Sequence, residues 1–113
     1  MEILESDAHG VTLAACSGRL DIASAPAAEK TLLALVGQRR PLLMDLSGLS
    51  YISSAGLRVI LKAAKEAKQT GHGFALAAAP PNVLEVLEIS GFPAIVPLHA
   101  TPAEGLAALR RDL

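Results

Sequence analysis

The residues best placed for chemistry are two adjacent serines, Ser53 and Ser54, at the start of an amphipathic segment. Apolar side chains then recur at helical spacing, at Leu57, Ile60, Leu61 and Ala64. A serine in front of a helix is a favoured N-cap, because its hydroxyl accepts a hydrogen bond from an unpaired backbone amide, worth about 1 kcal/mol. Gly56, in the first turn, costs about 0.8–1 kcal/mol of helix propensity relative to alanine. It therefore indicates that another backbone or a partner surface approaches closely there.

Other catalytic and ligand-binding patterns are missing from the sequence. Neither serine lies in the G-x-S-x-G frame of a hydrolase nucleophile, and no G-x-x-x-x-G-K or G-x-G-x-x-G phosphate-binding loop occurs. The three histidines, His9, His72 and His99, are far apart and adjoin turns, and no cysteine or carboxylate spacing completes a metal site with them. We therefore expect no enzymatic activity, no metal and no other cofactor.

Asp45 closes a buried apolar run, a pattern that receiver domains of response regulators share. Those domains also need an acidic pair after the first strand and a lysine after the last one. The lysines of this chain are Lys30, Lys62, Lys65 and Lys68, and none lies near the last predicted strand. The receiver interpretation is therefore rejected.

The apolar periodicity alternates between strands and helices. Strands are predicted at 1–6, 11–16, 41–46, 73–78 and 94–96, the first two as a hairpin. Helices are predicted at 25–36 after an N-cap at Ser24, and at 54–71, 80–91 and 102–111, with 47–53 as a loop. This order predicts an α/β sandwich with a mixed four- to five-stranded sheet, parallel in the centre and antiparallel at the edge, and about four helices.

The helix patterns also predict which side chains face inward. For the helix at 25–36 the inward stripe is Ala28, Leu32, Leu35 and Val36. The helix that begins at Ser54 is expected to bury Leu57, Ile60, Leu61 and Ala64. Its outer face is expected to carry Arg58, Lys62, Lys65 and Gln69.

Composition excludes several classes of protein. With 113 residues, 51% of them hydrophobic and 19% charged, the chain is expected to fold as one domain over residues 1–113. A net charge of −1 and 3% aromatic residues argue against nucleic-acid and anionic-membrane binding. No apolar run approaches the roughly 18 residues of a membrane span, and the acidic start does not resemble a signal peptide. The lone Cys16, expected to be buried, fits a reducing, cytoplasmic setting.

Four short motifs, taken in order, resemble the STAS domain family, and within it the bacterial anti-sigma factor antagonists. GRLD at 18–21 is similar to the family's G-x-L-D element, and DLSGL at 45–49 to its D-L-S-x-L run. YISSAGL at 51–57 is similar to the phosphorylation loop, aromatic-x-D-S-[ST]-G-L, and ISGF at 89–92 to the turn that ends the third helix. The resemblance covers nearly the whole chain and implies a STAS-type sandwich.

The resemblance implies roles for residues of the loop. The phosphorylated serine of the family corresponds to Ser54; Ser53 replaces the usual aspartate, and Ala55 replaces the second hydroxyl residue. Asp21 is expected beside this loop as part of the docking surface, or else as a residue that orients its own turn. The expected partner-binding residues are Asp21, Ser53, Ser54, Ala55, Gly56 and Arg58.

The implied function is regulatory. Unphosphorylated, the protein would bind an anti-sigma factor that is an ATP-dependent serine kinase, and so release the sigma factor. The kinase would inactivate it by phosphorylating Ser54, and a serine phosphatase would restore it. The alternative is a STAS subunit of a lipid-transport or signalling complex that docks without switching, with Ser54 only as a cap. The oligomeric state is left open.

Overall fold

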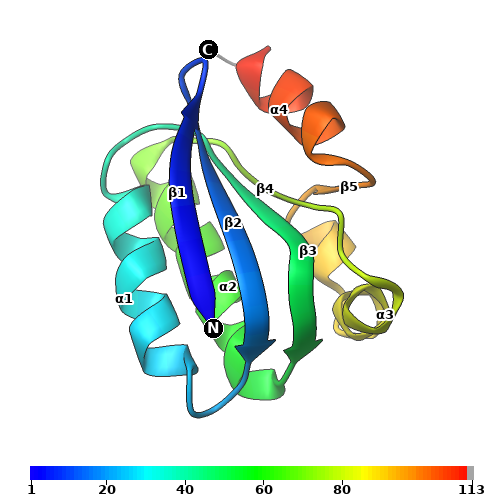
Figure 1. Ribbon diagram of the computed structural model, residues 1–113. Helices are drawn as coiled ribbons and strands as arrows, with labels where there is room; N and C mark the ends of the chain where they lie inside the picture. Colours follow the sequence, from blue (N-terminus) through cyan, green and yellow to red (C-terminus); the bar gives the residue numbers. More distant parts are fainter. Residues whose placement is uncertain (112–113) are drawn as a thin grey trace.

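The computed structural model describes residues 1–111, so the predicted single domain includes two residues, 112 and 113, outside the described part (Figure 1). One sheet contains β1 (Glu2–Ala8), β2 (Val11–Leu20), β3 (Leu42–Ile52), β4 (Phe74–Ala77) and β5 (Leu98–His99). The helices are α1 (Ala25–Val36), α2 (Ser54–Thr70), α3 (Pro81–Ile89), the short 3-10 helix η1 (Phe92–Ala94) and α4 (Pro102–Arg110). No helix within residues 1–111 combines the length and the apolar character needed to span a bilayer.

The strands lie side by side in chain order. β1 is antiparallel to β2, and the following pairs β2–β3, β3–β4 and β4–β5 are all parallel. The hairpin turns at His9 and Gly10, whose φ angles of 55° and 93° are the positive values that a tight two-residue hairpin turn requires. The predicted mixed sheet, with an antiparallel edge and a parallel centre, is confirmed.

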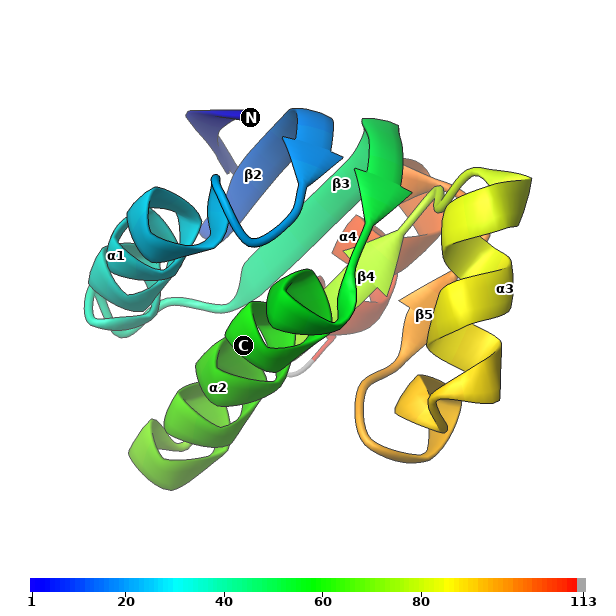
Figure 2. The same ribbon diagram turned by 90° about the horizontal axis from the view of Figure 1, so that it is seen from below.

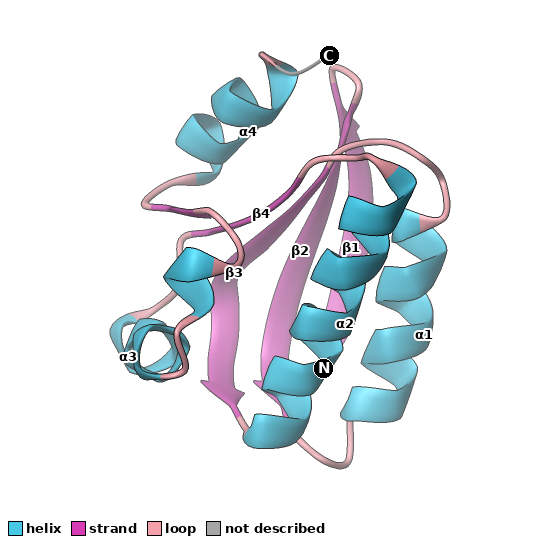
Figure 3. Ribbon diagram, turned by 180° about the vertical axis from the view of Figure 1, so that it is seen from behind, coloured by secondary structure: helices cyan, strands magenta, loops and turns pink. Residues whose placement is uncertain are grey.

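The helices cover the two faces of the sheet unequally. Figures 2 and 3 show α1 and α2 side by side on one face, α3 near the carboxyl end of β3, and α4 on the opposite face. The larger core cluster joins the buried side chains of α1, α2 and α3 to β2, β3 and β4. The smaller one lies under α4 and consists of Val11, Leu43, Ala75, Ala77 and Leu109. The sheet therefore has helical cover on both faces of its parallel part, as buried parallel strands require.

Two sequence predictions about strands were wrong. The segment 47–53, expected as a loop, continues β3 as far as Ile52, because it pairs with β2 through two irregularities in register. Leu49 and Ile52 are buried in it, whereas most of the intervening polar side chains are exposed. The strand expected at 94–96 is replaced by η1 and by a two-residue strand farther on, β5.

The helix faces agree with the sequence pattern to different degrees. α1 buries the four residues expected of it, Ala28, Leu32, Leu35 and Val36. In α2 the buried set is Gly56, Val59, Ile60, Ala63 and Ala67, whereas Leu57, Leu61 and Ala64 are only partly buried. Since α2 also packs against α1 along its flank, its buried face is rotated from the expected stripe. The residues expected on the outer face of α2 are all exposed: Arg58, Lys62, Lys65 and Gln69.

Cys16 is buried in β2, as expected. Burial foremost, with the nearby Asp45 carboxylate adding to the effect, raises the pKa of its thiol to about 12. The thiol therefore stays protonated at neutral pH, and Cys16 acts as a small hydrophobic residue.

Candidate functional site

Both predicted functional segments lie at the carboxyl ends of β2 and β3 (Figure 1). Because these strands are parallel, the turn after β2 and the start of α2 after β3 lie at the same edge of the sheet. A backbone hydrogen bond from the Ser53 amide to the Leu20 carbonyl, 2.9 Å long, joins the two ends directly. Asp21 and the two serines are therefore held at one end of the molecule.

The two serines have different roles at the start of α2. Ser53 is the N-cap: its backbone is extended, and its hydroxyl oxygen accepts a hydrogen bond from the Gly56 amide at 3.3 Å. Ser54 is the first residue of the helix and is exposed, and its hydroxyl forms no hydrogen bond to any residue in 1–111. The capping role that the sequence allowed for Ser54 thus belongs to Ser53.

Gly56 is buried, and the chain itself makes the close approach that its position indicated. A Cβ at residue 56 would lie 2.7 Å from the Leu20 Cγ, 2.7 Å from the Leu20 carbonyl oxygen and 2.9 Å from the Ile52 Cγ1. The glycine therefore lets the first turn of α2 lie against the end of β2. Its contribution to the site is the position of the two serines rather than exposed surface.

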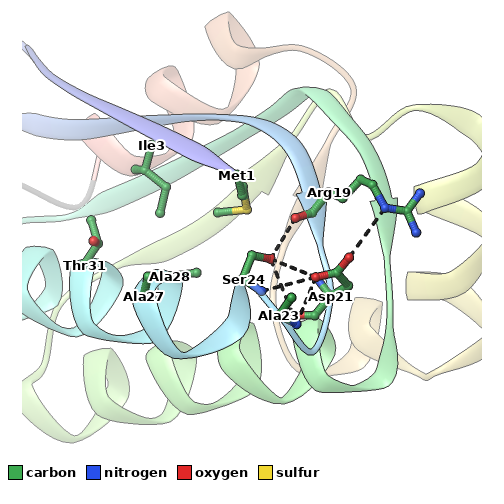
Figure 4. A pocket seen from close by; sticks show the side chains of 9 residues that line it. All are labelled: Met1, Ile3, Arg19, Asp21, Ala23, Ser24, Ala27, Ala28 and Thr31. Atoms are coloured by element: carbon green, nitrogen blue, oxygen red, sulfur yellow. Dashed lines mark hydrogen bonds and ion pairs between the residues drawn. The ribbon is translucent and has the colours of Figure 1, made fainter.

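Asp21 organises the turn between β2 and α1 (Figure 4). Its Oδ1 accepts hydrogen bonds from the amides of Ser24, at 3.2 Å, and Ala23, at 3.1 Å. These bonds, that from Ser24 foremost, hold the pKa of the Asp21 carboxyl below its usual range, and Arg19 adds to the effect. The turn-orienting role expected as an alternative is therefore present in the structure.

Ser24 occupies the N-cap position of α1, but its hydroxyl does not cap the helix amides. Instead, the hydroxyl donates to the Arg19 carbonyl at 2.7 Å and accepts from the Asp21 amide at 3.0 Å (Figure 4). The turn is therefore held by the side chains of Asp21 and Ser24, each of which accepts a hydrogen bond from the backbone amide of the other residue. Such a turn presents the Asp21 carboxylate, which is partly exposed, in a fixed orientation.

Arg19 and Tyr51 form a feature that sequence reasoning missed. They are partners in the parallel register of β2 and β3, and the Arg19 guanidinium lies 4.2 Å from the centroid of the Tyr51 ring. Arg19 Nε also lies 3.5 Å from Asp21 Oδ2. Because the strand was expected to end before residue 47, the register that pairs these two residues was not available from the sequence pattern.

The same edge exposes apolar surface. Ile22, in the turn after β2, is 81% exposed, and Tyr51 is 39% exposed. At this exposure the Ile22 side chain contributes little to the core, and aromatic residues are common anchors of protein interfaces. The isoleucine between an aspartate and an alanine is the signal that could have identified this position.

A shallow groove of about 300 Å³ separates the beginnings of α1 and α2. Its lining includes the half-buried Ala55 and the exposed Arg58 of α2, opposite Pro26 of α1. Arg58 Nε lies 3.5 Å from the Ser54 carbonyl oxygen, so the guanidinium stays beside the first turn. Of the six expected docking residues, the structure brings five to this end as at least partly exposed residues, and Gly56 lies beneath them.

The groups at this end of the molecule are suited to contact with another protein. Within residues 1–111 no group of three or more histidine, cysteine, aspartate or glutamate side chains is arranged to hold a metal ion. The site instead combines a fixed carboxylate, an exposed hydroxyl, a stacked arginine and two exposed apolar side chains. Such a combination is typical of a protein-docking surface.

Comparison with known proteins identifies the family. The STAS domain model matches residues 5–105. A protein of Bordetella bronchiseptica described as "Putative anti-sigma factor antagonist BtrV" is 38% identical over 115 residues, which cover all of this chain and 98% of that protein.

Solved structures of similar proteins support the same family. An anti-sigma factor antagonist from Mycobacterium paratuberculosis is 31% identical, with a TM-score of 0.89 over 96% of this chain and 93% of that chain. The anti-sigma factor antagonist SpoIIAA shares the fold in its unphosphorylated form, with 18% identity and a TM-score of 0.79 over 96% of both chains. The phosphorylated form of SpoIIAA from Bacillus matches at 16% identity, with a TM-score of 0.72 over 95% of this chain and 98% of that chain. The chain therefore belongs to the STAS domain family and is of the anti-sigma factor antagonist type.

Proposed function

We propose that this protein is a phosphorylation-switched antagonist in the cytoplasm, which binds a serine-kinase anti-sigma factor while Ser54 is unmodified and releases it when Ser54 carries phosphate. The observation that carries the proposal is the exposed Ser54 hydroxyl at the first position of α2, beside a second serine that already serves as the cap. A kinase can reach this hydroxyl without disrupting the helix. The related fold of SpoIIAA has been solved both unphosphorylated and phosphorylated.

The replacement of the family's aspartate by Ser53 is compatible with this function. Aspartate and serine are both strong N-cap residues, because each offers a side-chain oxygen to the amides of the first turn. Ser53 makes that bond to the Gly56 amide. The substitution thus preserves the start of α2 and removes one negative charge from the neighbourhood of Ser54.

A phosphate on Ser54 is tolerated within the protein itself. It brings a charge of about −1.5 to −2 and three acceptor oxygens to a helix N-terminus, where the backbone amides and the helix dipole favour an anion. The first turn of α2 contains no acidic residue, and the Arg58 guanidinium lies beside it. Phosphorylation is therefore expected to leave the fold intact.

The docked partner experiences the opposite effect. The exposed surface at the same end as Ser54 includes Ile22 and Tyr51. Burying a dianion in such an interface costs several kcal/mol unless positively charged groups of the partner pair with it. A penalty of about 3–5 kcal/mol lowers affinity by roughly a hundredfold to several thousandfold. The modification thus acts on the complex rather than on the antagonist alone.

The test has two parts. First, the protein is incubated with ATP and a candidate kinase anti-sigma factor, and its intact mass is measured; one added phosphate that maps to Ser54 is expected. The matched variants are Ser54→Ala, which should gain none, and Ser53→Ala, which should still be modified. Phosphate on Ser53, or none on either serine, contradicts the assignment and favours a STAS subunit that does not switch.

Second, binding to that anti-sigma factor is measured for the unmodified protein and for Ser54→Asp. We expect Ser54→Asp to bind at least a hundredfold more weakly, with Ser54→Ala close to wild type. Ile22→Ser should weaken binding to the anti-sigma factor, whereas a serine phosphatase should still remove phosphate from Ser54 of this variant. Equal affinity of the wild type and Ser54→Asp would remove the physical basis of the switch.

A further inference from the structure

A second surface, remote from Ser54, has features of a small-molecule site. A groove of about 510 Å³ lies between the C-terminal half of α2 and the segment from Ala94 to Val96 that begins in η1. Figure 2 shows α2 and η1 on the same side of β4. The residues of α2 that line the groove belong to its C-terminal half, away from its first turn. Ligand pockets typically enclose about 300–1,000 Å³. The groove is therefore of the size that a small organic molecule occupies.

One wall of the groove carries two lysines. Lys65 and Lys68 line it three residues apart on one side of α2, and His72 lines it just after the helix ends. Within residues 1–111 neither lysine forms an ion pair, and no carboxylate lines the groove. Like charges at such spacing repel one another, so an anion placed between them is favoured. At the end of α2, the carbonyls of Lys68 and Ala67 accept hydrogen bonds from the amides of Gly71 and His72.

The other wall and the floor are apolar. Phe74 at the start of β4, Val96 and Ala64 form part of the lining, and Ile95 beside them is 53% exposed. Among residues 1–111, no hydroxyl or amide side chain that would hydrogen-bond a sugar or a base lines the groove. The chemistry of the groove thus matches a molecule with one anionic end and an apolar remainder.

We propose that this groove binds an amphipathic carboxylate, such as a medium-chain fatty acid, with its head group between Lys65 and Lys68 and its chain along Phe74 and Ile95. The head group would lie between two ammonium groups that form no ion pair within residues 1–111, and the chain would cover the exposed Ile95 side chain beside the largely buried Phe74. The proposal concerns a site separate from Ser54, and it stands or falls independently of the switch proposed above.

Calorimetric titration of the full chain with decanoate, below its micelle-forming concentration, tests the proposal. Saturable one-to-one binding is expected, with at least tenfold weaker binding by the double variant Lys65→Gln, Lys68→Gln. The matched control is Lys62→Gln on the same helix, because Lys62 pairs with Glu29 of α1, 3.4 Å away, and does not line the groove. Decanol, which has the same chain and no charge, should bind at least tenfold more weakly than decanoate.

The apolar wall is tested with Ile95→Ser, whose exposed position makes the substitution compatible with folding. It should weaken decanoate binding several-fold, whereas Ile89→Ser, at a still more exposed position on α3 outside the groove, should not. Absence of saturable binding at millimolar decanoate overturns the proposal. Equal affinity for decanoate and decanol also overturns it. A third contrary outcome is that the protein associates with anionic vesicles but does not bind free decanoate.

Discussion

The carbonyl of Leu20 accepts a hydrogen bond from the amide of Ser53 at 2.9 Å, and this contact fixes the start of α2 against the end of β2. The same leucine lies directly beside Gly56, where no side chain could fit without displacement. One residue at the end of a strand thus determines where the helix that carries the candidate phosphorylation site begins. The position of Ser54 is consequently a property of the sheet as much as of the helix.

The division of roles between the two serines predicts different effects on stability. Ser53→Ala removes the hydroxyl that accepts the Gly56 amide and should lower the free energy of unfolding by about 1 kcal/mol. Ser54→Ala should change it by less than about 0.5 kcal/mol, as is usual for surface positions. Urea unfolding of both variants measures the difference. Equal losses would mean that Ser54 shares the capping role.

The close contact at Gly56 predicts that alanine is not tolerated there. Gly56→Ala gains about 1 kcal/mol of helix propensity, but its Cβ meets the backbone oxygen of Leu20, which cannot move without shifting β2. Overpacking of this kind costs about 1–3 kcal/mol and more where backbone must move. We expect net destabilisation in thermal or urea unfolding.

Gly105→Ala in α4 is the matched control for that prediction. Its Cβ would also lie 2.7 Å from a neighbour, but the neighbour is the end of the Leu43 side chain. That side chain can adjust, so the loss should be smaller than for Gly56→Ala. A larger loss for Gly105→Ala would show that backbone contact is not the decisive feature.

Thr12 predicts a stabilising substitution. It is 1% exposed, and its hydroxyl oxygen has no hydrogen-bond partner in the described part of the chain. A buried polar group without a partner costs about 1–3 kcal/mol, so Thr12→Val, which keeps the shape, should raise the free energy of unfolding by about 1 kcal/mol. Thr101→Val should instead lower it, because the Thr101 hydroxyl caps α4 by accepting the Glu104 amide at 3.2 Å. Both values come from urea unfolding.

Asp21 predicts a dependence of stability on acidic pH. Its pKa is lower in the folded protein than its ordinary value of 3.8, chiefly through the hydrogen bond from the Ser24 amide. At a pH between the lowered pKa and the ordinary value, the Asp21 carboxyl is protonated more often in the unfolded chain than in the folded one. The stabilisation is therefore complete above the ordinary value, and it is lost as the pH falls through the lowered pKa.

Asp21→Asn tests this assignment, because the amide oxygen can still accept the bonds from Ser24 and Ala23 while the titrating group is removed. Unfolding followed by circular dichroism from neutral pH down to about pH 2 should show a shallower loss of stability for the variant than for the wild type. Parallel curves would assign the acid sensitivity to other carboxylates.

Much of the architecture follows from local sequence patterns. The inward stripe of α1 and the end of α2 at Gly71 were both predicted, since each depends on residues within one or two turns. The hairpin and the order of the elements followed in the same way. Serine, tyrosine and glycine between 47 and 51 pointed to a loop, yet this stretch is strand, because pairing with β2 overrides its weak local preference.

The sequence alone determined that a serine pair opens an amphipathic helix and that a glycine in its first turn needs an unusually close neighbour. Only the tertiary structure decided which serine caps the helix, that the neighbour is Leu20, and that Arg19 stacks on Tyr51 beside Asp21. The physical reason is that the contacts of Leu20 with Gly56 and of Arg19 with Tyr51 join segments more than 30 residues apart. Their geometry depends on the register of β2 against β3, which periodicity within either strand does not encode.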